Sequence, residues 1–167
     1  MIVRTIAATG HRPQKLGGFS DRINKQLKLL AIDHLNYRTT PIYSETIGIS
    51  GMALGWDTAV ALACVELDIP FIAAVPFKGQ ESRWGQRDQE IYRMLLEKAI
   101  RVEYVCEPGY APCKMFKRNE WMVDHASEMA ALWDGVKSGG TYGCIQYAEK
   151  QGKEIHNLWE AWEQRRA

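Results

Sequence analysis

The sequence carries almost no net charge, because 21 lysines and arginines are balanced by 20 aspartates and glutamates. A dedicated duplex-DNA-binding domain has a clear excess of positive charge, so the composition disfavours that class of protein. Long apolar runs are also missing. None approaches the ~20 residues that a membrane helix needs, and the first residues do not resemble a secretion signal. We therefore expect a cytoplasmic protein without membrane contact.

Cysteines are few and widely spaced. Cys64, Cys106, Cys113 and Cys144 form no Cys-x-x-Cys pair, and no histidines accompany them at zinc-finger spacing. That pattern disfavours both a zinc site and a disulfide framework. We expect reduced, mostly buried thiols, no bound metal and no cofactor.

Strand-like and helix-like patterns alternate along the whole chain. Short apolar runs predict six strands, at residues 2–8, 42–49, 69–75, 102–105, 129–133 and 154–158. Helical patterns follow them, at residues 20–35, 55–67, 81–99, 119–127, 141–151 and 159–166. This alternation favours an α/β fold, with a mostly parallel sheet and helices on both of its faces. No stretch has the composition of a linker, so we expect a single domain over residues 1–167.

Three of the predicted strands end in turns of glycine and small polar residues, and a helix follows each turn. The turns are Thr9-Gly10-His11-Arg12, Ser50-Gly51-Met52-Ala53-Leu54-Gly55-Trp56-Asp57, and Ser138-Gly139-Gly140-Thr141, which follows Asp134-Gly135. Parallel strands end at a common edge, so we expect the N–H groups and helix N-termini of these turns to meet there. Such an edge favours an anion, and the predicted ligand is a phosphate-bearing small molecule, in particular a nucleotide.

The first two turns each allow a functional and a structural interpretation. Gly10 either lets a ligand approach the backbone or makes an ordinary turn, and Arg12 is either a phosphate contact or a solvated charge. His11 has less support, because a histidine in an exposed loop often has no role. In the second turn, Gly51 gives access to the backbone, and Asp57 either holds a ribose hydroxyl or caps the helix.

The third turn is the best candidate for a phosphate cradle. Adjacent Gly139 and Gly140 free the backbone to wrap around an anion, and Thr141 adds a hydroxyl at the start of a helix. The structural alternative is a hairpin or helix-entry turn, which two glycines serve equally well. Asp134, just before this turn, is either a ligand group or part of another turn.

Two further pairs complete the set of candidates. Gln80 and Trp84 are four residues apart, a spacing that predicts one shared helical face, with Trp84 stacked on a base and Gln80 at its polar edge. The alternative for Trp84 is the core or a dimer interface. Arg118 closes over a phosphate in the functional interpretation, whereas Asn119 caps a helix in the structural one.

Six ordered blocks covering nearly the whole chain carry a family resemblance. They are Thr9-Gly10-His11-Arg12-Pro13, Ser50-Gly51 through Asp57, Pro76-Phe77 with Gln80 and Trp84, Arg118-Asn119 with Met122-Val123-Asp124, Trp133-Asp134-Gly135, and Ser138-Gly139-Gly140-Thr141. Together they resemble the SLOG superfamily, which includes the LOG phosphoribohydrolases and DprA, and most closely its YpsA-like branch. The resemblance implies a Rossmann-like three-layer sandwich, a nucleotide pocket and a homo-oligomer. By position, it assigns to that pocket Gly10, Arg12, Gly51, Asp57, Arg118, Asn119, Gly139, Gly140 and Thr141.

One position departs from the LOG pattern. LOG enzymes carry a glutamate three residues after the threonine of their glycine motif, where it is tied to cleavage of an N-glycosidic bond. This chain has Cys144 there. A neutral thiol neither stabilises an oxocarbenium-like transition state nor activates water well. Asp57, Glu81 and Asp134 are candidate substitutes, and the spacing selects none of them.

These observations support three hypotheses. The leading one is a nucleotide-binding or nucleotide-sensing protein, with catalysis left undecided. The second is an enzyme that hydrolyses or transfers at the N-glycosidic bond of a nucleoside or nucleotide. The third is single-stranded DNA binding as in DprA, which the balanced charge disfavours but the basic residues Lys114, Lys117 and Arg118 keep open.

Overall fold

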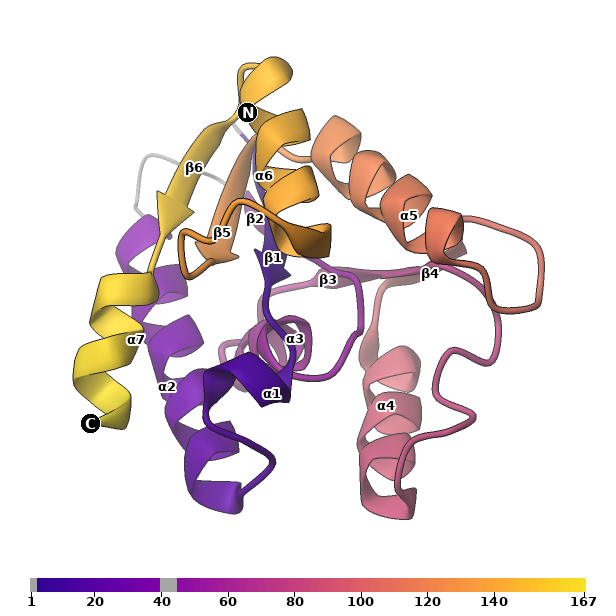
Figure 1. Ribbon diagram of the computed structural model, residues 1–167, viewed down its shortest axis with the longest axis horizontal. Helices are drawn as coiled ribbons and strands as arrows, with labels where there is room; N and C mark the ends of the chain where they lie inside the picture. The colour runs from indigo at the N-terminus through magenta and orange to yellow at the C-terminus, as the bar shows by residue number, and fades with distance from the viewer. Residues whose placement is uncertain (1–2, 40–44) are drawn as a thin grey trace.

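The computed structural model describes residues 3–39 and 45–167, and these contain one six-stranded sheet (Figure 1). The strands are β1 Val3–Gly10, β2 Glu45–Ser50, β3 Phe71–Val75, β4 Arg101–Tyr104, β5 Glu128–Leu132 and β6 Glu154–Asn157. They lie in the order β4-β3-β2-β1-β5-β6, and every pair of neighbours is parallel. The predicted α/β class is confirmed.

Helices cover both faces of the sheet, which makes the fold a Rossmann-like three-layer sandwich. In the described residues they are α1 Pro13–Leu16, α2 Asp21–Arg38, α3 Trp56–Glu66, α4 Gln86–Lys98, α5 Pro112–His125, α6 Gly139–Lys150 and α7 Trp159–Arg166. One hydrophobic core lies between the sheet and α2, α3, α4 and α7, and a second lies beneath α5 and α6. No helix in these ranges is long and apolar enough to cross a membrane.

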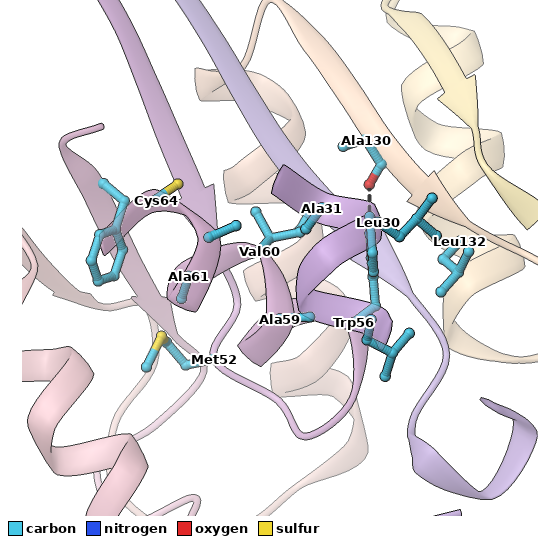
Figure 2. Packing of buried hydrophobic residues seen from close by; sticks show 14 of the residues in the cluster. Leu30, Ala31, Met52, Trp56, Ala59, Val60, Ala61, Cys64, Ala130 and Leu132 are labelled. Atoms are coloured by element: carbon cyan, nitrogen blue, oxygen red, sulfur yellow. Dashed lines mark hydrogen bonds between the residues drawn. The ribbon is translucent and has the colours of Figure 1, made fainter. Parts of the chain in front are cut away.

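Strand β1 serves both cores because its side chains alternate between the two faces. Ile6 and Ala8 join the larger core, whereas Ala7 packs in the smaller one. Trp56 is fully buried in the larger core, and its Nε1–H donates to the Ala130 carbonyl oxygen at 3.0 Å (Figure 2). A tryptophan buries roughly 150–250 Å² of surface, so this one side chain fixes the start of α3 against the sheet.

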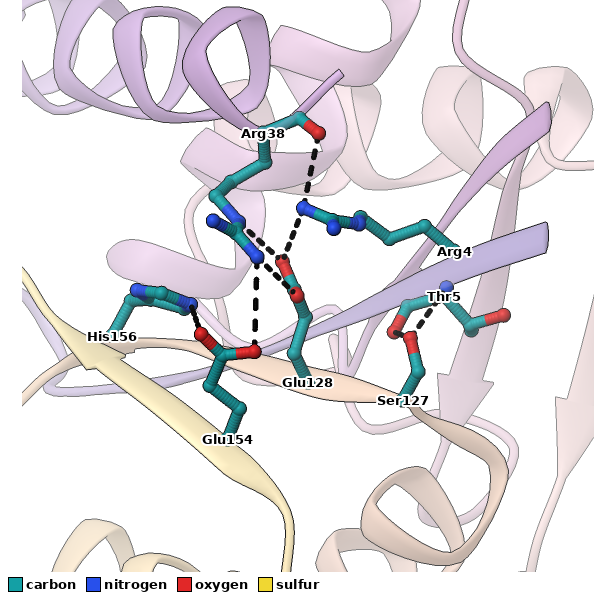
Figure 3. Close-up of polar contacts among 7 residues, drawn as sticks. All are labelled: Arg4, Thr5, Arg38, Ser127, Glu128, Glu154 and His156. Atoms are coloured by element: carbon teal, nitrogen blue, oxygen red, sulfur yellow. Dashed lines mark hydrogen bonds and ion pairs between the residues drawn. The ribbon is translucent and has the colours of Figure 1, made fainter. Parts of the chain in front are cut away.

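A charged cluster closes the amino-terminal edge of the sheet (Figure 3). Glu128 is buried at the start of β5 and accepts two hydrogen bonds from Arg38, at 2.9 Å and 2.8 Å. Arg4 lies 3.6 Å from the same carboxylate and donates to the Arg38 carbonyl oxygen at 3.0 Å. Although burial acts to raise it, these guanidinium groups hold the pKa of Glu128 below its usual value. The cluster therefore ties β1, α2 and β5 together.

Several boundaries differ from the sequence-based predictions. The helix predicted at residues 119–127 begins at Pro112, because proline fits the first helical position, where no N–H donor is needed. Helix α4 begins at Gln86 rather than at residue 81, since turns precede it. The short helix α1 was not predicted. Residues 42–44 of the second predicted strand and residue 2 of the first lie outside the described ranges.

The strand order places a topological switch point beside β1. After β1 the chain adds β2, β3 and β4 on one side, and then returns to add β5 and β6 on the other. Loops that leave the carboxyl ends of β1 and β5 therefore diverge, and such a point leaves a crevice that commonly binds ligands in open α/β sheets. Two of the three turns identified in the sequence follow these two strands.

Candidate functional site

A cavity of about 360 Å³ opens at the switch point. Its walls come from the turn after β1 with α1, the start of α3, one face of α5 and the N-terminus of α6. The lining residues are Ala8, Thr9, Gly10, His11, Arg12, Gln14, Lys15, Ala53, Asp57, Met115, Arg118, Asn119, Met122, Ser138, Gly139, Gly140 and Thr141. The fold thus brings the first and third predicted turns together, with Asp57 from the second.

The N-terminus of α6 presents bare backbone to this cavity. Gly139 has a φ of +89°, a left-handed conformation that glycine adopts without strain. Apart from its chain neighbours and the nearby backbone of α6, a Cβ added at Gly140 would meet no described atom within 4 Å, so open space faces this residue. Ser138 makes no side-chain capping bond there. The first N–H groups of α6 are therefore available to a ligand.

One face of α5 forms another wall. Met115, Arg118, Asn119 and Met122 follow helical spacing and all line the cavity. Arg118 is buried, and its guanidinium donates to the Gly51 carbonyl oxygen and, at 2.9 Å, to Asn119 Oδ1. Asn119 therefore lies inside α5 and orients Arg118, and its interpretation as a helix cap is wrong.

Asp57 faces the cavity from the first turn of α3. Burial raises the pKa of Asp57 to about 6, although the charge of Arg118 and a backbone hydrogen bond from Ala53 act to lower it. Both charged side chains crowd Gly51, where a Cβ would lie 2.6 Å from Arg118 Nη1 and 2.7 Å from Asp57 Oδ2. Ser50 is buried and donates to the Asp57 carbonyl oxygen at 2.7 Å. Ser50 and Gly51 thus do not line the cavity, but Ser50 bonds to Asp57 and Gly51 leaves room for the Asp57 and Arg118 side chains.

His11 connects the two turns that flank the switch point. Burial lowers the pKa of His11 and outweighs the opposing effect of the Asp134 carboxylate. A neutral ring allows Nε2 to accept a hydrogen bond from the Asp134 backbone N–H, at 3.1 Å. The Asp134 carboxylate lies 3.0 Å from the same nitrogen and 3.7 Å from Lys15 Nζ. Asp134 therefore positions two lining residues and does not line the cavity itself.

Gly10 is required for packing, a role that sequence reasoning did not assign to it. A Cβ at Gly10 would lie 2.5 Å from Trp56 Cδ1, well inside contact distance. Any larger residue would therefore displace the indole that anchors α3.

A second cavity, of about 680 Å³, contains Gln80 and Trp84. The prediction that these two residues share a helical face is wrong, because the segment that holds them forms turns before α4. Gln80 Nε2 lies 3.4 Å from the Gly51 carbonyl oxygen and so links this segment to the second turn. Trp84 packs edge-on against Tyr92 with 5.3 Å between ring centroids, so part of its surface belongs to the core.

A family model described as the YspA SLOG family matches residues 6–159. The chain belongs to this family. An uncharacterized SPbeta prophage-derived protein of Bacillus subtilis strain 168, YoqJ, is 38% identical over 128 residues, which cover 66% of this chain and 73% of YoqJ.

Two solved structures of DNA processing protein A (DprA) share the fold. DprA from Streptococcus pneumoniae gives a TM-score of 0.61 at 17% identity, over 92% of this chain and 49% of that one. DprA from Helicobacter pylori, solved for its single-stranded DNA binding mode, gives a TM-score of 0.64 at 15% identity, over 91% and 63%. This chain thus spans between about half and two thirds of the DprA chains that it matches.

Within the SLOG fold, Cys144 occupies the place where the LOG resemblance leads one to expect a glutamate. Cys144 is part of α6, and its thiol is buried in the smaller core. Burial raises the pKa of Cys144 to about 11, although a hydrogen bond with Thr9 acts to lower it. A thiol that stays protonated at neutral pH is a poor acid–base group. Of the proposed substitutes, Asp57 lines the first cavity, whereas Glu81 lines neither cavity.

Sequence reasoning missed three residues that line the first cavity, and two of them, Gln14 and Met115, also line the second. Gln14 and Lys15 come from α1, and Met115 lies on α5 three residues before Arg118. A proline directly after Arg12 was the available signal for α1, since proline is common at the first helical position.

Proposed function

We propose that the cavity at the switch point binds a nucleotide, with a phosphate at the N-terminus of α6. The observation that carries this proposal is the bare backbone at Gly139 and Gly140, which faces open space beside positively charged side chains. Free N–H groups and the helix dipole favour an anion at such a terminus. The phosphate of a nucleotide is an anionic group of the kind that such a terminus binds. The proposed role is therefore that of a nucleotide-binding or nucleotide-sensing protein.

The charges around the cavity support an anionic ligand. Arg12 is exposed, and its guanidinium has no hydrogen bond or ion pair with any residue in the described ranges. It is therefore ready to fork onto phosphate oxygens. Arg118 is already occupied by backbone and amide oxygens, so it contributes a fixed positive charge instead. Asp57 is the one carboxylate among the lining residues.

Thermal unfolding in the presence of AMP, GMP, CMP and UMP tests the proposal, with inorganic phosphate as a comparison. A ligand at 100 times its Kd adds about 2.7 kcal/mol to the free energy of unfolding, so at least one nucleotide should raise the melting temperature by several degrees. Calorimetry should then give a stoichiometry of one per chain. No shift with any nucleotide at millimolar concentration would contradict the proposal.

Hydrolysis at an N-glycosidic bond is a second candidate, and Asp57 is the observation that favours it. A cavity-lining carboxyl whose pKa is about 6 can exchange a proton with water or a leaving base near neutral pH. Chromatography should then detect free base released from a bound nucleotide, and Asp57→Asn should abolish the release while nucleotide binding persists. Intact nucleotide after long incubation with wild-type protein would remove this candidate.

A further inference from the structure

The second cavity lies beside the first one and has nearly twice its volume, about 680 Å³ against about 360 Å³. Four residues line both: Arg12, Gln14, Ala53 and Met115. The two cavities therefore form two compartments of one binding region, with Arg12 at the junction.

The charges of the second compartment are all of one sign. Lys78 and Arg83 line it together with Arg12, and no aspartate or glutamate is among its lining residues. None of these three side chains has an ion-pair partner within the described ranges. Unpaired cations around a concave, partly apolar wall favour an anionic ligand there too.

Aromatic side chains supply the apolar part of the same compartment. Phe19 and Tyr110 line it while remaining 55% and 72% exposed. Tyr110 meets the edge of buried Phe77, with 6.1 Å between ring centroids, and Trp84 adds a further ring. Exposed aromatic faces next to cations are the surfaces on which nucleobases stack, at about 1–3 kcal/mol per base.

We propose that the ligand has two nucleotide units joined through a pyrophosphate. One phosphate of the pyrophosphate lies at the N-terminus of α6 and the other lies beside Arg12 at the junction, and the base of the second unit stacks in the compartment of Phe19 and Tyr110. This inference rests on the proposed function of the first cavity. A mononucleotide would fill the first cavity alone and leave the cationic, aromatic compartment without an occupant.

Calorimetry tests this with a matched pair of probes. They are whichever of AMP, GMP, CMP and UMP binds most tightly and the corresponding symmetrical P1,P2-dinucleoside 5′-diphosphate. We expect the dinucleotide to bind at least tenfold more tightly than the mononucleotide. The double variant Phe19→Ala/Tyr110→Ala should lose that advantage while keeping the affinity for the mononucleotide, because neither side chain lines the first cavity.

Phe116→Ala is the control. This aromatic side chain is 48% exposed on α5 and lines neither cavity, so its removal should change neither affinity. Equal affinities for the two probes, or a dinucleotide advantage that survives in the double variant, would overturn the two-compartment ligand and leave the proposed function intact. Failure of both probes to bind would overturn both. Tight, steeply salt-dependent binding of oligothymidylate in place of the dinucleotide would also overturn it, in favour of single-stranded DNA.

Discussion

The amino-terminal and carboxyl-terminal ends of the strands form two edges that differ in whether their charged side chains are paired. At the amino-terminal edge, Arg38 forks onto buried Glu128 and Arg4 lies beside the same carboxylate. At the carboxyl-terminal edge, Arg12, Lys78 and Arg83 line cavities without an ion-pair partner in the described ranges. The first edge is internally neutralised, so it serves the fold. The second retains unpaired cations, which is the arrangement that the proposed anionic ligand requires.

The two edges also differ in how closely other parts of the chain surround them. Glu128 begins β5, and its side chain is fully engaged with neighbouring elements. At the other edge, the first residues of α6 face open space, and Gly140 has no neighbour at the place where a side chain would begin. Substitutions at the first edge should therefore change stability and leave binding intact, whereas substitutions at the second should do the reverse.

The largest expected effect is that of Glu128→Ala on stability. The substitution leaves Arg38 and Arg4 without the carboxylate that they share, and removing one partner of a buried ion pair costs about 3–5 kcal/mol. Urea denaturation should report a fall in the free energy of unfolding of at least ~3 kcal/mol. Nucleotide affinity of the folded variant should not change. A loss below about 1 kcal/mol would show that the cluster does not support the fold as described.

The next effect is acid destabilisation through His34. The His34 side chain is buried, and its ring centroid lies 5.5 Å from that of His156. His34 Nε2 has no hydrogen-bond partner in the described chain. Burial, assisted by His156, lowers the pKa of His34 from 6.5 to about 4. Between pH 6.5 and 4, His34 is therefore protonated in the unfolded chain but neutral in the folded chain. The free energy of unfolding consequently falls as pH falls.

The loss attributable to His34 is up to about 3 kcal/mol over that interval. Urea denaturation at a series of pH values measures it, and His34→Leu should flatten the profile. Glu128 acts in a separate window, because its contribution disappears only as pH falls below its unfolded value of 4.5. A profile with the same slope in His34→Leu would assign the acid sensitivity to other groups.

Arg12→Ala should have a smaller effect, and on binding alone. Hydrogen bonds to charged groups contribute about 1.5–3 kcal/mol, so nucleotide affinity should fall roughly ten- to a hundredfold. The free energy of unfolding should stay within about 0.5 kcal/mol, because the side chain is exposed and has no partner in the described chain. Arg87→Ala is a control on a similarly exposed arginine away from both cavities. Unchanged affinity would remove Arg12 from the site.

Local patterns predicted the fold and part of the site. Strand-like runs alternating with helical patterns imply parallel strands, and parallel strands bring their terminal turns to one edge. The sequence therefore predicted that Gly139 and Gly140 lie near Arg12, and all three line the first cavity. The helix predicted from residue 20 is α2, where Ser20 Oγ caps the helix by accepting a hydrogen bond from Ile23 N at 3.2 Å.

What the sequence did not predict depends on contacts between distant residues. Nothing in the local pattern pairs Arg38 with Glu128, which lies 90 residues further along the chain. The contact that requires glycine at position 10 comes from Trp56, on another element. The shared helical face of Gln80 and Trp84 failed because their four-residue spacing has meaning only inside a helix, and α4 begins after both.

Calorimetric titration of Gly140→Ala with the best-binding nucleotide tests most directly whether a phosphate binds at the start of α6. Apart from the adjacent backbone of α6, the methyl group of alanine at this position meets no described atom within 4 Å, so the fold should tolerate it. The same methyl group enters the space assigned to the phosphate. Gly85→Ala is the matched control, because it also faces open space but lines neither cavity. We expect at least a tenfold loss of affinity in Gly140→Ala, with unchanged thermal stability and no loss in the control. Wild-type affinity in Gly140→Ala would contradict the placement of a phosphate at the start of α6.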